Sequence, residues 1–420
     1  LCGGLIASLI CSGGIAATPA APAPKAGWLR LNDLFGMPIW SDYLLWDDAE
    51  RAVARRLGLP EESRTSVMAG YHAYPGGKTK ILGEPCYSFS MLCDSAHVTS
   101  ISIVFANKGD VVGLQDGAHM VGGRPVTTVN YKPQIAAAAT NVERVITSLL
   151  RAPKVQTYGE KHGATREEVK RWDVKGHAIL LAAPADEYVL VRIVPTADAD
   201  AEGRTPRISS ETLRTLIAAR VTQRANGDVV ITDIPMIHQG PKGYCVPATW
   251  ARYCLYLGIP ADMYVLAMAA ETGAGGGTTL EGMVANINWL IYKHGRHIKS
   301  SRNRPLVKHV ATYINAGMPV MWPLCADTNF YFDTLLDRSA RRRDCADIQA
   351  WNSELQASRR AARSLRPDPT LGHICMIIGY NKTTRELAIS DSWGALFEER
   401  WITEEEADAI SFGKLYIIQW

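Results

Sequence analysis

The feature that most constrains the fold is a loop rich in glycine and proline that leads into an apolar segment. Residues 239–244 read Gln-Gly-Pro-Lys-Gly-Tyr, and they deliver Cys245 to a segment whose apolar residues, 251–257, recur at helical spacing. Pro247 is tolerated near a helix start because its missing N–H would be unpaired there, and Gly258 is a suitable C-cap. The sequence therefore predicts a cysteine in the first turn of a buried helix.

A cysteine in that position is suited to nucleophilic chemistry. The positive end of the helix dipole and the free N–H groups both favour the thiolate, which is the nucleophilic form. Gln239 lies six residues before Cys245, so its side-chain amide can donate a hydrogen bond near the sulfur. We therefore expect Cys245 to be a nucleophile and Gln239 to stabilise a developing oxyanion.

The matching base is predicted at the head of an apolar strand, residues 372–380, whose second residue is His373. A hairpin turn at 381–384 leads to a second strand, 386–390, which is followed by Asp391. Two paired strands place His373 and Asp391 side by side. Asp391 can then accept a hydrogen bond from one imidazole nitrogen while the other nitrogen faces the thiol.

In this order and spacing, the four residues resemble the papain-like cysteine peptidase superfamily. Its members commonly carry an Asn-Ser-Trp-Gly motif, which reads Asp-Ser-Trp-Gly at 391–394, whereas the papain signature after the cysteine is absent. The chain is more similar to the bacterial branch related to bacteriocin-leader-processing peptidases. That branch shows an Ala-Gly-x-Pro-Val strand before the histidine, matched here by residues 316–320.

The resemblance covers residues 228–420 and implies both a fold and an activity. The implied fold is α+β: a papain-like catalytic domain with a helical part and an antiparallel sheet. The implied activity is thiol-dependent hydrolysis of peptide bonds in a peptide or protein, through a Cys-His-Asp triad and an acyl-enzyme, with no cofactor or metal. Two alternatives stay open. One is an amidase or transglutaminase-like acyltransferase on the same triad, and the other is a catalytically silent binding protein.

The preceding half, residues 28–222, reads as a mixed α/β domain of unknown role. Helices are expected at 47–58 and 133–150, and each is followed by strand-like runs: 66–74, 86–92 and 99–106 after the first, and 178–183 and 188–194 after the second. This repeated order suggests an internal duplication. The half could be a propeptide-like inhibitor, a substrate-recruiting module or an independent domain, and its length favours a stable fold.

Two segments of the C-terminal half invite a functional interpretation. The glycine run 273–277 lacks the Lys-Ser/Thr of a phosphate loop, so we expect a flexible loop, with Thr278 and Glu281 forming a capping box for the next helix. Residues 326–370 interrupt the catalytic domain with interleaved arginines and acids. This pattern favours a solvated helical insertion over a lid, although the segment ends just before His373.

Composition and the N-terminus bound the remaining possibilities. A net charge of +3 over 420 residues favours neither nucleic acid nor a membrane surface as partner. Residues 1–27 resemble a signal-like leader with an Ala/Pro linker, so export to the periplasm or medium is expected, with anchoring through the N-terminus left open. No later segment reaches membrane-spanning length. Disulfide pairing among the nine cysteines and the oligomeric state stay open.

Overall fold

The computed structural model describes residues 27–94, 96–113, 120–121, 124–125, 129–326, 328–343, 345 and 347–420. The expected leader lies outside this part of the chain, apart from its last residue. Helices and strands are interspersed along the chain, and most of the strands form two eight-stranded sheets. All strand pairs in these two sheets are antiparallel. This mixed architecture is consistent with the predicted α+β class.

The first sheet belongs to the N-terminal half. The elements of this half are α1 (Gly27–Phe35), α2 (Glu50–Leu57), β1 (Glu61–Arg64), β2 (Ala69–Ala73), β3 (Thr79–Ile81), β4 (Glu84–Cys86), β5 (Ser88–Cys93), β6 (Val98–Asn107), α3 (Lys108–Val112), β7 (Met120–Val121), β8 (Arg124–Pro125), α4 (Lys132–Leu150), β9 (Lys154–Gly159), β10 (Arg166–Val174), β11 (His177–Ala182), β12 (Tyr188–Pro195) and α5 (Thr196–Asp200). The pairs β3–β4 and β7–β8 are separate two-stranded sheets. The strand order is β1-β2-β5-β6-β12-β11-β10-β9. Each half of the sheet is thus a four-stranded meander that follows a helix, and the two meanders meet at the β6–β12 pair. Duplication itself stays a prediction.

The second sheet contains the catalytic candidates. Its elements are α6 (Ser210–Ala218), β13 (Val221–Gln223), β14 (Asp228–Ile231), α7 (Cys245–Tyr256), α8 (Met263–Ala269), α9 (Leu280–Lys293), β15 (His297–Ser301), α10 (Val307–Asn315), β16 (Val320–Cys325), the π-helical turn η1 (Thr328–Thr334), α11 (Leu335–Arg343), α12 (Ile348–Ala362), β17 (Gly372–Asn381), β18 (Glu386–Ser390), the 3₁₀ turn η2 (Ala395–Phe397), β19 (Arg400–Thr403), α13 (Glu404–Ile410) and β20 (Leu415–Gln419). The order is β13-β14-β17-β16-β20-β15, with β18 and β19 continuing from β17. Although α6 and β13 precede the predicted boundary near 223–227, they pack with this second sheet.

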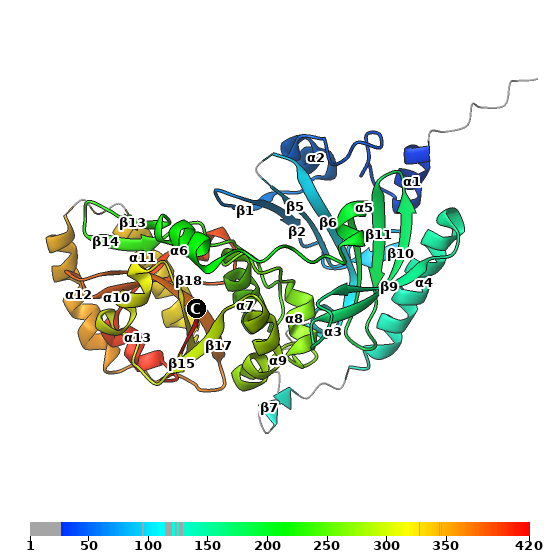
Figure 1. Ribbon diagram of the computed structural model, residues 1–420. Helices are drawn as coiled ribbons and strands as arrows, with labels where there is room; N and C mark the ends of the chain where they lie inside the picture. The colour runs from blue at the N-terminus through cyan, green and yellow to red at the C-terminus, as the bar shows by residue number, and fades with distance from the viewer. Residues whose placement is uncertain are drawn as a thin grey trace, which may run out of the picture.

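The two sheets share the helices α7, α8 and α9, which lie between them in Figure 1. Along β11, Ile179 and Leu181 pack into the cluster that contains α4, whereas Ala178 and Leu180 face a second cluster with Met263 of α8. A strand buried on both faces reads as an unbroken apolar run, which is how β11 reads. The N-terminal sheet therefore has one face covered by its own helices and the other by helices of the C-terminal half.

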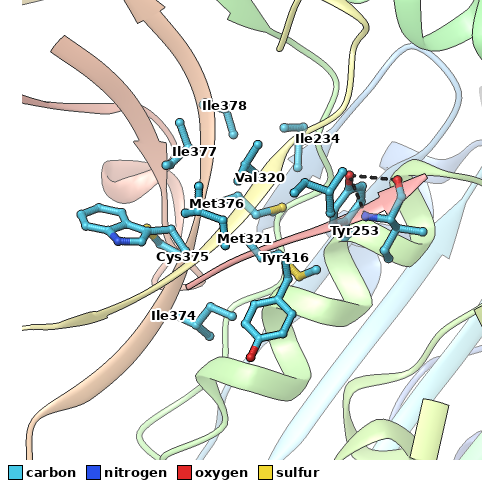
Figure 2. Packing of buried hydrophobic residues seen from close by; sticks show 14 of the residues in the cluster. Ile234, Tyr253, Val320, Met321, Ile374, Cys375, Met376, Ile377, Ile378 and Tyr416 are labelled. Carbon is cyan, nitrogen blue, oxygen red and sulfur yellow. Dashed lines mark hydrogen bonds between the residues drawn. The ribbon is translucent and has the colours of Figure 1, made fainter. Parts of the chain in front are cut away.

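The core that positions the site lies between α7 and the second sheet. Figure 2 shows Ile374, Cys375 and Met376 of β17 together with Met321 of β16 and Tyr253 of α7. The Tyr253 hydroxyl also hydrogen-bonds the Ile418 carbonyl, which ties α7 to β20. Close packing of this kind fixes the helix relative to β17, and so fixes the distance between the first turn of α7 and the start of β17.

The cysteines in the described part of the chain are all free thiols. None of the helices described there combines the length and the apolar character needed to cross a bilayer.

Candidate active site

Cys245 is the first residue of α7, as predicted. Tyr244 is the N-cap residue, so the N–H groups of the first turn have no partners within the helix. The Cys245 side chain is half-buried, whereas Cys254 on the same helix is fully buried. Cys245 is thus a thiol at the positive end of a helix dipole that a reagent can reach.

His373 stands at the start of β17, and Asp391 directly follows β18. Because Met376 pairs with Ser390, the two strands bring His373 and Asp391 together. His373 Nε2 lies 2.8 Å from Asp391 Oδ1. The Cys245 side chain beside the ring also raises the pKa of His373, and with Nε2 bonded to Asp391, Nδ1 is the nitrogen available to the sulfur. The structure therefore brings together three of the predicted residues, and each ring nitrogen has the expected neighbour.

The electrostatics of this group favour its charged forms. Burial disfavours a charged imidazole, but the hydrogen bond to Asp391 and the neighbouring Cys245 side chain outweigh burial and raise the pKa of His373 to about 9. Burial likewise opposes ionisation of Asp391, yet the Arg400 guanidinium and His373 lower its pKa to about 2. At neutral pH the site therefore holds an imidazolium next to a carboxylate.

Two residues that the sequence analysis missed hold Asp391. The Tyr331 hydroxyl donates to Oδ1 at 2.8 Å, and an Arg400 Nη2–H donates to Oδ2 at 2.7 Å. Both side chains are fully buried, and the guanidinium carbon of Arg400 lies 4.4 Å from the Tyr331 ring centroid. Arg400 opens β19 directly after Glu398 and Glu399, so no local pattern distinguished it from an ordinary surface arginine. Tyr331 lies in the inserted segment, where the sequence carried no sign of a contact with Asp391.

The Asp-Ser-Trp-Gly motif supplies further contacts on both sides of the site. The Trp393 ring stacks on the His373 ring with centroids 4.1 Å apart, which restricts the imidazole orientation. Phe332 stacks on the outer side of Trp393 at 4.4 Å. The Ser392 hydroxyl donates to Gln239 Oε1 at 2.9 Å, and the Ser392 carbonyl accepts from the Gln239 backbone N–H.

Gln239 is held so that its amide nitrogen faces inward along the nucleophile loop, residues 238–244. Its Nε2 donates to the Lys242 carbonyl at 2.8 Å. With Oε1 occupied by Ser392, the second N–H of this amide is the donor left for a substrate oxygen. Gln239 is buried, as expected for an oxyanion donor in a water-excluded site.

The inserted segment 326–370 forms η1, α11 and α12 and is helical, as predicted. Much of it is exposed, as expected of a solvated insertion, but Arg338 and Arg342 are buried. Arg338 makes two 2.6 Å hydrogen bonds to Glu406, while Arg342 bonds Asp228 at 2.7 Å and Glu386 at 2.8 Å. All five side chains are buried. The charge pattern misled because the acidic partners come from distant parts of the sequence.

The glycine run also differs from its prediction as a flexible loop. Gly243 N donates to the Gly275 carbonyl at 3.0 Å, and Gly277 N donates to the Gly243 carbonyl at 3.1 Å. A Cβ on Gly243 would lie 2.9 Å from the Gly276 Cα, so these backbones touch only because neither residue has a side chain. The run therefore supports the nucleophile loop directly.

The predicted capping box beside this run is wrong. Thr279 caps α9 by accepting from Gly282 N, and the Thr278 hydroxyl instead pairs with Thr272. Glu281 bonds Lys414.

Comparison with known proteins bears on the C-terminal half. No curated protein matches this chain. Gln239, Cys245, His373 and Asp391 all fall inside one matched region, however. Residues 231–414 match the model described as the Peptidase_C39 like family, which is consistent with the papain-like cysteine peptidase superfamily.

Proposed function

We propose that this chain is a cysteine peptidase that hydrolyses peptide bonds through a thioester on Cys245. The observation that carries the proposal is the buried His373 ring, whose Nε2 lies 2.8 Å from Asp391 Oδ1 and whose pKa is raised by the neighbouring Cys245 side chain. The family match suggests cysteine peptidase activity in general. The roles of the individual residues are our inference from their positions.

In the proposed reaction, the Cys245 sulfur attacks the carbonyl carbon and His373 holds the thiol proton. The oxyanion accepts hydrogen bonds from Gln239 Nε2 and the Cys245 backbone N–H. His373 then gives its proton to the leaving amine as the C–N bond breaks, which leaves a thioester. A water molecule, deprotonated by His373, attacks the thioester and releases the acid. Asp391 keeps the imidazole oriented throughout.

The first test measures alkylation of the purified chain by iodoacetamide across pH, with the modified cysteines mapped by mass spectrometry. We expect Cys245 to react well below neutral pH and His373→Ala to abolish this reactivity. Cys345, which is also half-buried and free, serves as an internal comparator.

The second test separates hydrolysis from its alternatives. The chain is incubated with unfolded casein, with and without excess methylamine, and new peptide termini are mapped. Hydrolysis that Cys245→Ala abolishes and Cys345→Ala leaves unchanged supports the proposal. Methylamine adducts that replace hydrolysis would indicate an acyltransferase. A Cys245 no more reactive than Cys345 would indicate a silent binding protein and overturn the proposal.

A further inference from the structure

The N-terminal half contacts the nucleophile loop at two places, and the first is a buried ion pair. Lys242 in the loop is only 1% exposed, and its Nζ lies 2.9 Å and 3.0 Å from the two carboxylate oxygens of Asp110 on α3. Burial lowers the pKa of Lys242, and Asp110 opposes this by stabilising the charged form. An ammonium group buried this deeply is tolerated only beside its counter-charge, so Asp110 fixes where Lys242 can lie.

This ion pair leads directly to the oxyanion donor. The carbonyl of Lys242 is the group that accepts from Gln239 Nε2. Asp110 therefore fixes the Lys242 side chain, and the Lys242 carbonyl in turn fixes the Gln239 amide. The same helix supports the glycine run, since the Lys108 carbonyl accepts from Gly275 N.

The second contact is at the other end of the loop. The Tyr74 hydroxyl lies 2.7 Å from the His238 carbonyl, and Glu62 accepts from His238 N at 3.2 Å. Glu62 is itself fixed by His72, 3.0 Å away. Gln239, the next residue after His238, thus has an anchor from the N-terminal half on each side.

We propose that the N-terminal half is a permanent part of the active site, in which Asp110 and Lys242 are positioning residues for the oxyanion donor Gln239. The shared apolar cluster, which includes Tyr188 of β12 and Tyr264 of α8, supports a permanent attachment over a removable pro-segment. The contacts hold the loop that carries Gln239, and they leave Cys245 half-exposed. The catalytic consequence rests on the proposed function, whereas the ordering of the loop does not.

The test uses the full chain with Asp110→Asn, and Glu160→Gln as the matched control. Glu160 is a buried acid of the N-terminal half that pairs with Lys293 of α9, so the control breaks a different ion pair between the halves. Backbone hydrogen exchange over residues 239–245 is measured by mass spectrometry. We expect Asp110→Asn to speed exchange about tenfold and Glu160→Gln to leave it unchanged.

A kinetic comparison then isolates the oxyanion donor. Acetyl transfer from p-nitrophenyl acetate to Cys245 passes through an oxyanion, whereas alkylation by iodoacetamide does not. Asp110→Asn should slow acetyl transfer about tenfold and change alkylation less than twofold. A general loss of structure would slow both. Should Asp110→Asn fail to fold, Tyr74→Phe removes the other anchor and should speed exchange about threefold.

The outcomes are distinguishable. Unchanged exchange together with unchanged acetyl transfer in Asp110→Asn would overturn the positioning role. A wild-type chain that never accepts an acyl group would overturn the proposed function, and the exchange measurement would still decide whether Asp110 orders the loop.

Discussion

At the scale of single residues, the charge of the site depends on whether His373 is protonated. His373 is buried between a carboxylate and a sulfur, and both favour its protonated form enough to raise its pKa to about 9 from an ordinary value of 6.5. A group whose pKa is raised by folding stabilises the folded state most at low pH, and that contribution is lost as the pH rises through the raised value.

We therefore expect the free energy of unfolding to fall between about pH 6.5 and about pH 9 as His373 loses its proton. Urea unfolding at several pH values measures this, with His373→Gln as the comparison. The variant should lack the slope in that window. A wild-type stability that stays level from pH 6.5 to 9 would contradict the charged histidine.

Tyr331 gives a second prediction at this scale. Tyr331→Phe removes one hydrogen bond to Asp391 and keeps the ring, so the carboxylate should orient His373 less well. A hydrogen bond to a charged group contributes about 1.5–3 kcal/mol, so acyl transfer to Cys245 should slow at least about tenfold. Tyr380→Phe, which removes a hydroxyl bonded to Asn315 outside the site, is the control and should have little effect. Equal rates in both variants would show that Tyr331 has no positioning role.

At the scale of elements, buried ion pairs attach the inserted helix α11 to the second sheet. Arg342→Ala would leave Glu386 buried without its counter-charge and Asp228 with only Arg224, 3.9 Å away. Breaking such a pair typically costs 3–5 kcal/mol, so the variant should lose about 3 kcal/mol of unfolding free energy. The neighbouring Arg341 is 57% exposed, and Arg341→Ala should cost less than about 1 kcal/mol. Urea unfolding compares the two variants. Similar losses of unfolding free energy would show that the buried ion pairs of Arg342 do not stabilise the fold.

The glycine run allows a separate prediction. Gly276 has φ +129°, and a Cβ there would overlap the Gly243 backbone. Gly276→Ala should therefore displace the nucleophile loop and slow acyl transfer to Cys245 at least about tenfold, because small displacements in an active site are costly. Gly413→Ala is the control, since Gly413 has φ +71° but no atom within 4 Å of an added Cβ. Gly413→Ala also places a side chain at a positive φ and should keep the rate, so a loss in both variants would show that the overlap with Gly243 is not the cause.

At the scale of the whole molecule, the two halves share an apolar cluster. Removing residues 1–207 would keep α6 and β13 but expose the sides of α7 and α8 that pack on the first sheet, including Ala248, Met263 and Val265. Exposed apolar surfaces of this kind promote association. We expect residues 208–420 alone to aggregate, whereas residues 28–420 stay monodisperse in size-exclusion chromatography. A monomeric fragment with a reactive Cys245 would show that the C-terminal half folds independently.

The sequence predicted the elements that carry strong local signals. The apolar runs at 178–183 and 188–194 predict β11 and β12, which span His177–Ala182 and Tyr188–Pro195. It missed β9 and β15, which are edge strands with mostly exposed or half-buried residues. An edge strand of this kind lacks the apolar periodicity from which a strand is read.

The sequence by itself determined the chemistry at the centre: a thiol at a helix start, a histidine at a strand head, and an acid one hairpin away. These are local signals, because each depends on residues within one element or one turn. Only the tertiary structure decided what holds that chemistry in place. Tyr331 and the Asp110–Lys242 pair act across long stretches of chain. A buried charge is made tolerable by whichever partner the fold brings to it, and nothing local in the sequence says which partner that will be.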